Sequence, residues 1–347
     1  MTAKVFSYTV TVGGVDHTNE KIAGLSWRKS SAKLPISGCV TGCLEVTLVT
    51  EICPDDNSAV TVACSNGMAF PTFCIASRSV PSAGLLKLVC YDRMMFTDRN
   101  FDISAYSEDK TVSIGTVMAH IVSQCGFSGV GGLVLHGADK VAVDEIKGKT
   151  CREVLEMLSE GACGIWYCDT ENKLTFLPFG TLNTLITPDV YAAVRAGSVK
   201  GPISRIIAEN STDGEEYDTG GSTSVRGIIR TESIFASAEN AAGILGNCNG
   251  FEFKAFRCPK ARLASGIEIG CGVMFGEDEY TVTNFALSFS PAGIFAELSA
   301  PELNESEYDY LNRARRDAKS AVKAGRTYKN VMVSKYEGLS LVGRDKA

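Results

Sequence analysis

Two short stretches of the sequence, far apart in the chain, carry nearly the same turn. Residues 79–90 read SVPSAGLLKLVC, and residues 288–299 read SFSPAGIFAELS. In each, a proline stands one or two positions before an Ala-Gly pair and apolar residues follow, which is typical of a turn between two strands. Gly67 precedes the first Ala-Gly pair by the same number of residues as Gly276 precedes the second. This spacing predicts two copies of one three-stranded unit.

The first part of the chain, residues 1–92, consists of short segments in which apolar and polar residues alternate. Residues 6–12 alternate in this way before a Gly-Gly turn, and residues 39–52 repeat the pattern before the breaker PDDNS. An Asn66-Gly67 pair then provides the strongest short signal for a chain reversal. Six or seven short strands without a helix predict a sandwich or a barrel, and we expect residues 1–92 to be a first β-barrel domain.

The pattern changes in residues 93–200. Apolar residues recur at helical spacing over residues 114–126, which end in a glycine. A second helix is expected from Thr150, because Thr150 and Glu153 form the T-x-x-E pattern in which each side chain satisfies a free backbone donor of the first turn. A strand pair follows over residues 164–180. These elements predict a small α/β domain.

Alternating strands return in residues 201–302 and end in the repeated turn, which predicts a second β-barrel domain. The acidic stretch at residues 213–224 is expected to be a mobile loop or an insertion at the barrel rim. Asn304 and Glu307 form another capping pattern, so residues 303–347 are expected to hold a C-terminal helix and an extended basic tail. The fold class is therefore α+β and mainly β, with two similar barrels separated by the α/β domain.

Cysteine usage argues against disulfides and metal. The 13 cysteines are spread singly through apolar strands of a 347-residue chain, whereas disulfide frameworks occur in short secreted domains. The closest pairs are four and five residues apart, and none of the three histidines lies near them in the sequence. We expect reduced core cysteines, with no metal and no cofactor.

Charge divides the chain into an acidic body and a basic tail. Residues 313–347 hold ten Lys/Arg against three Asp/Glu, a local charge of +7, so the net charge of −6 leaves −13 for the remainder. The tail fits either a solvated helix face or docking on an acidic protein surface. Specific nucleic-acid binding is not expected, because only Tyr328 and Tyr336 are available there for stacking. No apolar window reaches the roughly 18 residues of a membrane span, and no signal peptide opens the chain, so we expect cytoplasmic synthesis.

Candidate catalytic residues are few. His120 falls on the apolar side of a predicted helix, where a packing role is the simpler interpretation. His136 precedes a glycine turn with Asp139 nearby, but no serine or cysteine stands in a recognisable nucleophile motif. Three further stretches have structural explanations, namely the acidic hairpin tip at 277–279, the loop pair at 215–216, and GVGG at 129–132, which lacks the lysine of a phosphate loop. We predict no active site.

The order of parts resembles the tail hub (baseplate hub) proteins of tailed bacteriophages and phage-derived contractile particles, a family that includes late-control protein D and the tail proteins of Gram-positive prophages. CREVLEMLSEGACGIWYCDTENKLTFLPF, at 151–179, is similar to the family's helix, glycine turn and Trp-bearing hairpin. Residues 240–300, with FEFKAFRCP and SGIEIGCGVMF, resemble its second barrel, and residues 4–27 and 85–103 resemble its first barrel and the crossing that follows. Cys271 stands where the family often has Asp, and Ala255-Phe256 replaces Pro-Phe.

The resemblance implies a structural, non-enzymatic hub that acts as a homotrimer. Three chains with two barrels each would form a pseudo-sixfold ring, which joins a hexameric tail tube to a trimeric spike or tip. Its implied partners are the tail tube or a tube-initiator protein, the spike or tip protein, baseplate wedge proteins and the tape measure. Its place would be the tail tip or baseplate of a virion or a tail-like bacteriocin, assembled in the bacterial cytoplasm.

Two alternatives stay open from the sequence. One is a particle-associated cell-wall hydrolase or peptidase that uses His136 and Asp139. The other is the hub of a bacterial contractile secretion spike, which shares the expected fold but would continue into a long β-helical needle.

Overall fold

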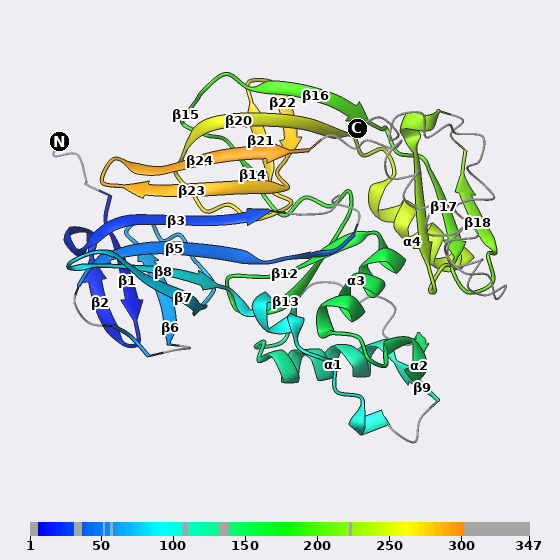
Figure 1. Cartoon of the computed structure of the whole chain (residues 1–347). Coiled ribbons are helices and arrows are strands. Elements are labelled where there is room, and N and C mark those ends of the chain that lie inside the picture. The colour runs from blue at the N-terminus through cyan, green and yellow to red at the C-terminus, as the bar shows by residue number, and fades with distance from the viewer. Residues whose placement is uncertain are drawn as a thin grey trace, which may run out of the picture. The chain divides into compact units, whose positions relative to one another are not determined.

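The computed structural model describes residues 6–30, 37–50, 53–55, 58–106, 110–131, 139–221 and 224–301. It is mainly β, with 48% strand and few helices, as the sequence predicts. Residues 1–302 form one compact unit (Figure 1). The predicted C-terminal helix and basic tail, residues 303–347, lie outside the described residues.

The first strand region forms one half of a large, mostly antiparallel sheet. Its strands follow one another in space as β3-β5-β8-β7-β6-β1-β2. Their bounds are β1 Tyr8–Val12, β2 Val15–Thr18, β3 Ile22–Ser30, β5 Gly42–Val49, β6 Ala59–Cys64, β7 Phe73–Ser82 and β8 Leu85–Tyr91. Asn66-Gly67 does form a turn, since the Gly67 N–H donates to the Cys64 carbonyl at 3.0 Å, but eight residues, 65–72, separate β6 from β7.

The α/β part is built as its local signals predict. Helix α1 spans Ile114–Cys125 with Ser113 as its N-cap, and helix α3 spans Cys151–Ala162 with the Thr150–Glu153 capping box formed in both directions. The remaining elements are 3₁₀ helices η2 Arg93–Asp98 and η3 Ser104–Tyr106, helix α2 Val143–Ile146, and strands β9 Thr111–Ser113, β10 Val130–Gly131, β11 Lys140–Ala142, β12 Gly164–Cys168 and β13 Leu174–Pro178.

One strand of the α/β part comes from outside it. The four-stranded sheet runs β10-β13-β12-β4, and β4, Cys39–Val40, belongs to the first strand region. It pairs parallel to β12, with Trp166 opposite Cys39. The α/β part is therefore locked to the first strand region through its backbone.

The second strand region holds the rest of the large sheet and two small sheets. The large sheet continues through β23 Asn284–Ser290, β24 Gly293–Ala300 and β20 Phe253–Leu263, with β15 Val190–Tyr191 and β16 Arg195–Lys200 both paired to β20. Strands β14 Leu185–Ile186, β21 Gly272–Phe275 and β22 Asp278–Thr281 form a second sheet. Strands β17 Arg205–Asn210, β18 Glu216–Gly220 and β19 Ile228–Ser233 form a third, and β19 follows the 3₁₀ helix η4 Val225–Gly227.

Two sequence expectations for this region are wrong. Helix α4, Ala238–Cys248, stands where only strands are expected, and it contacts β17 and β18. The acidic stretch, expected to be a mobile loop or an insertion at a barrel rim, is not a mobile loop, because it contains strand β18, which pairs antiparallel with β17. Its alternation of exposed acids with half-buried Tyr217 and Thr219 is a strand pattern that the high charge concealed.

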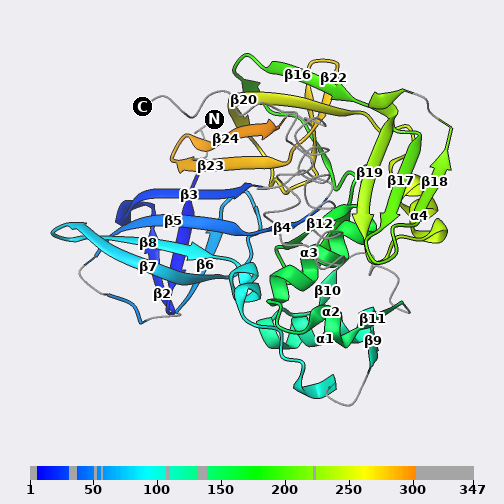
Figure 2. The same ribbon diagram turned by 45° about the vertical axis from the view of Figure 1, so that its right-hand side comes forward.

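Strands β3 and β23 join the two strand regions into a single 12-stranded sheet. They pair antiparallel from Asn284 opposite Ser30 to Ser288 opposite Ser26, and lie side by side in Figures 1 and 2. Trp27 packs at this seam against Phe285, Phe70 and Phe73, with ring centroids 5.0–6.3 Å apart. The described strands form no closed barrel.

Candidate functional site: a buried charge cluster where three regions meet

Lys29, near the end of β3, is the centre of a buried charge cluster. Its side chain is 1% exposed. The Nζ atom lies 2.6 Å from Glu268 Oε2, in the second strand region, and donates to the Cys168 carbonyl, in the α/β part, at 2.8 Å. It also lies 5.0 Å from the centroid of the Tyr167 ring. One ammonium group therefore contacts all three regions.

Asp92 is the second acid of the cluster. It is fully buried where β8 leads into the 3₁₀ helix η2. Its Oδ2 accepts from the Gly42 N–H at 2.7 Å, and its Oδ1 accepts from the Met94 N–H at 3.0 Å. The carboxylate thus caps η2 and ties it to β5.

Burial controls the titration of both acids. Desolvation raises the pKa of Asp92 to about 7, and the positive charge of Lys29 opposes that rise. Burial also raises the pKa of Glu268, against the ion pair with Lys29. Replacing one partner of such a cluster leaves another charge buried without compensation, which costs about 3–5 kcal/mol. The cluster acts as a structural joint that holds three regions in one arrangement.

Three further hydrogen bonds fasten the α/β part to the first strand region. The Arg152 Nη2 atom donates to Thr41 Oγ1 at 2.9 Å. Ser159 Oγ accepts from the Gly38 N–H at 2.8 Å, and Asn172 Oδ1 accepts from the Thr72 N–H at 2.8 Å. Each bond joins residues that lie 100 to 121 positions apart in the sequence. The contact between the α/β part and the first strand region therefore continues beyond the cluster around Lys29.

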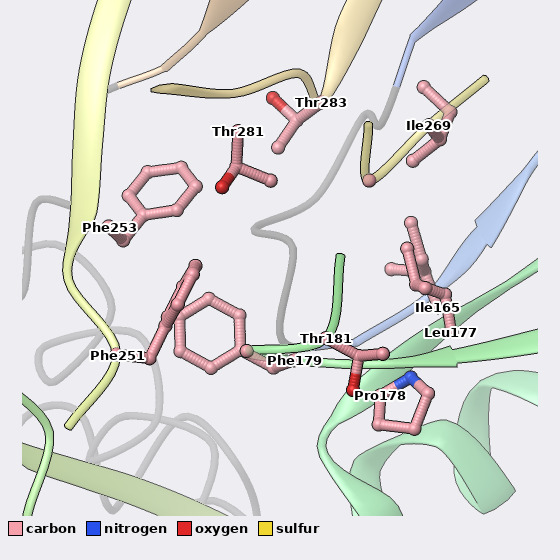
Figure 3. A pocket seen from close by; sticks show the side chains of 12 residues that line it. Ile165, Leu177, Pro178, Phe179, Thr181, Phe251, Phe253, Ile269, Thr281 and Thr283 are labelled. Carbon is pink, nitrogen blue, oxygen red and sulfur yellow. The ribbon is translucent and has the colours of Figure 1, made fainter. Parts of the chain in front are cut away.

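A small depression lies beside the joint, between the α/β part and the second strand region (Figure 3). Its space is about 300 Å³, part of it open to solvent. It is lined by Ile165, Leu177, Pro178, Phe179, Gly180, Thr181, Phe251, Phe253, Ile269, Gly270, Thr281 and Thr283. These residues offer threonine hydroxyls but no titratable side chain, so the lining holds no general acid or base.

His120 is one of the two histidines considered as catalytic residues, and the structure describes its surroundings. Its Nδ1 atom lies 2.8 Å from the Tyr106 hydroxyl, and its ring packs 5.1 Å from that of Phe101. The expected packing role is confirmed. His136 lies outside the described residues, while the backbone carbonyl of Asp139 accepts from the Ile114 N–H at 2.8 Å. The alternative of a hydrolase that uses His136 and Asp139 is therefore not tested by the described residues.

The other stretches singled out in the sequence have structural places. Glu277 lies in the turn between β21 and β22, and Asp278 forms an ion pair with Lys254 at 3.5 Å, as expected of a hairpin tip. Val130 and Gly131 form β10, while residue 132 lies outside the described residues. All 13 cysteines are free thiols and ten are buried, as predicted. Within the described ranges, no group of His, Cys, Asp and Glu is arranged to hold a metal ion.

Sequence reasoning missed Lys29, Asp92 and Glu268, although one signal was available. Along β3, Leu25, Trp27 and Lys29 occupy alternate positions and are all buried. A lysine in phase with two large apolar residues indicates an inward-pointing charge, which needs a buried partner. Nothing local identifies Glu268 as that partner, because it lies 239 residues away.

Comparison with known proteins rests on structure. No protein-family model matches the chain, and no curated protein matches it. None of the helices in the described ranges combines the length and apolar character needed for a bilayer crossing.

Three solved tail proteins have similar structures. The 43 kDa tail protein of prophage MuSo2 from Shewanella oneidensis is 15% identical, with a TM-score of 0.53 over 85% of this chain and 98% of that one. The tail protein from Neisseria meningitidis MC58 is 12% identical, with a TM-score of 0.52 over 85% and 96%. The prophage tail protein gp18 from Listeria monocytogenes EGD-e is 12% identical, with a TM-score of 0.51 over 87% and 96%. At these identities the likeness shows the fold, and the chain has the fold of these prophage tail proteins.

Proposed function

We propose that this protein is the structural hub of a phage tail or phage-tail-like particle, a homotrimeric symmetry adaptor between a hexameric tail tube and a trimeric spike or tip. The observation that carries the proposal is the fold, which matches three prophage tail proteins over at least 85% of this chain and 96% of each of them. The role is structural rather than enzymatic, at the tail tip or baseplate.

The arrangement of the sheet supports an adaptor. A threefold protein can meet a sixfold tube only if each chain presents two similar surfaces. The β7–β8 and β23–β24 hairpins carry the repeated turn, and both belong to the same 12-stranded sheet. We propose that residues 1–92 and 201–302 act as two barrel-like domains around the α/β part at 93–200, and that neighbouring chains complete their open edges.

The joint around Lys29 supports a rigid role. Large protein assemblies transmit load and symmetry through fixed geometry, and a buried, hydrogen-bonded charge cluster specifies one arrangement of the parts that it joins. In the hub, this joint would keep both hairpins at a fixed separation from the α/β part.

Mass measurement and particle images test the proposal. Native mass spectrometry or light scattering of the purified protein should give three copies, and class averages of assembled particles should show threefold density at the tail tip. A stable monomer that never joins a tail would contradict the proposal.

The basic tail at residues 303–347 is proposed to dock on an acidic protein of the same particle, such as the spike or a wedge protein. Truncation after Gly325 removes five of the ten Lys/Arg of residues 313–347. Truncated protein should keep its folded body and bind tail components more weakly in pull-down assays, and equal binding would count against this docking.

A further inference from the structure

One edge of the 12-stranded sheet is unusually basic. The edge strands β15 and β16 and the adjacent strand β20 contain six Lys/Arg and no Asp/Glu, and two of the six, Lys254 and Arg257, form ion pairs with Asp278 and Glu297. Arg195 of β16 stands directly opposite Arg257 of β20 in the antiparallel register. Glu297 of β24 compensates the charge of Arg257, with 2.7 Å between Arg257 Nη2 and Glu297 Oε1, and Arg195 is exposed on the outer strand. We name these three strands the basic edge.

Apolar side chains are exposed at the same edge. Eight large apolar residues of the described chain are exposed, and five of them fall between residues 182 and 199. On this edge, Val190 and Tyr191 of β15 are 65% and 42% exposed, and Val199 of β16 is 39% exposed. A concentration of exposed apolar surface beside charges is typical of a protein–protein interface.

An acidic edge with the opposite character occurs in the three-stranded sheet β18-β17-β19. Glu216 stands opposite Glu209 in the antiparallel pair, and Glu209 stands opposite Glu232 in the parallel pair. Opposed residues project from the same face, so three glutamates form a row across the sheet. Strand β18 is the outer strand and its Glu216 is exposed. We name β18 and this row the acidic edge.

We propose that the basic edge of one subunit docks on the acidic edge of a second copy of the chain, with Arg195 facing Glu216. This deepens the proposed function, since it rests on the homotrimer. Arg195 and Glu216 are exposed charges of opposite sign, so a contact that brings them together is complementary in charge. Within the described residues β16 pairs only with β20 and β18 only with β17, and the six residues of β16 match the five of β18 in length.

The two edges differ, so the contact is head-to-tail. A heterologous contact generates a closed ring when its rotation closes, which is the symmetry that a trimeric hub requires. The exposed apolar residues around β15 would be covered in the same contact. Charge pairing then selects the register, and apolar burial supplies affinity.

Reciprocal charge reversal tests the contact. We would compare Arg195→Glu, Glu216→Arg and the double variant with wild type by sedimentation over a concentration series. Each single reversal should raise the concentration for half-dissociation of the trimer by about tenfold or more, and the double variant should restore it. Lys140→Glu and Glu20→Lys, exposed charges on other elements, are matched controls that should leave association unchanged.

The outcomes separate the two proposals. Trimers that persist in both single variants overturn the edge contact and leave the hub standing, whereas a wild-type monomer overturns both. If a reversal prevents folding, a photo-crosslinking residue at position 195 replaces it. Crosslinks between subunits should map to residues 209–218, and crosslinks that map only elsewhere refute the contact.

Discussion

The β7–β8 and β23–β24 hairpins carry nearly the same turn sequence, but different neighbours flank their outer strands. Strand β23 pairs with β3 along five residues. Strand β7 pairs with β6 only at Phe73 and Cys74. Burial follows from this: β23 and β24 alternate buried and less buried positions to the turn, whereas every residue of β7 after Ile75 is exposed. Figure 2 shows the β7–β8 hairpin extending beyond its neighbours.

The position of the proline explains part of the difference. Pro291 lies in the turn itself, and β23 pairs with β24 without a register shift. Pro81 lies within β7, where the pairing with β8 shifts between Ser79 and Ser82. A proline cannot donate to the ladder and is tolerated at bulges and edges. A repeated turn therefore specifies a repeated hairpin, while non-local strand partners decide whether that hairpin is buried.

The largest expected effect is at the joint beside the second hairpin. Lys29→Met should lower the free energy of unfolding by about 3–5 kcal/mol, because the fully buried Asp92 and the mostly buried Glu268 both lose their compensating charge. Lys87→Met, on the first hairpin, removes a lysine that is 43% exposed and paired with Glu45, and should cost less than about 1 kcal/mol. Denaturant unfolding of both variants measures the contrast. Equal losses would contradict the distinct roles of the two regions.

The pH dependence of stability probes the same joint. Because burial raises the pKa of Asp92 from 3.8 to about 7, the folded state binds more protons than the unfolded state between those values. The free energy of unfolding therefore falls as pH rises from about 4 to about 7, by up to about 4 kcal/mol from this group. Two charged groups act on the pKa of Asp92 against this background of burial: the positive charge of Lys29 lowers it and the carboxylate of Glu268 raises it.

Asp92→Asn should remove that contribution. The difference in unfolding free energy between wild type and variant should shrink across this pH range and stay constant above it. Asp98→Asn, at an aspartate whose side chain is 66% exposed, serves as the control. A constant wild-type-minus-variant difference from pH 4 to 7 would show that Asp92 is ionised throughout.

Removing a buried aromatic side chain from the second hairpin should have an intermediate effect on the free energy of unfolding. Phe289 of β23 is buried, with ring centroids 5.9 Å from Tyr8 and 5.8 Å from Phe70. Phe289→Ala should cost about 3 kcal/mol. Val80→Ala, at an exposed position of β7, should change stability by less than about 0.5 kcal/mol. Thermal and denaturant unfolding measure both changes in stability. A large loss of stability for Val80→Ala would contradict the exposed position of Val80 in the first hairpin.

Local signals predicted much of the fold. The terminal glycine of α1, Gly126, the N-terminal cap of α3 and the repeated turns are each encoded within a few residues. Helix α4 was missed because its segment is rich in small residues, including Gly243 and Gly246, although Ser237 accepts from the Asn240 N–H as an N-cap. The pairing of β3 with β23 could not be predicted from the sequence, because Ser30 and Asn284 lie 254 positions apart and no local pattern selects that pairing.

The smallest expected effects lie in the turns themselves. Gly84 has a φ of +74°, and a methyl group added there would meet no heavy atom within 4 Å. Gly84→Ala should therefore lower the free energy of unfolding by about 1 kcal/mol, which is the cost of holding an alanine in the left-handed backbone conformation. Gly293 has a φ of +124°, outside that left-handed region, so Gly293→Ala should cost about 2 kcal/mol or more. The nearest neighbour of the new methyl group, the Arg262 side chain at 3.4 Å, can move aside.

The two substitutions therefore differ only in the backbone strain that they introduce. Denaturant unfolding of the two variants measures the resulting difference in their free energies of unfolding. A larger loss for Gly293→Ala confirms that the repeat is shifted by one residue, with the glycine in the turn of the first hairpin and in the strand of the second. Equal losses would mean that both glycines occupy the same turn position. In that case the two hairpins would be closer copies than their different surroundings indicate.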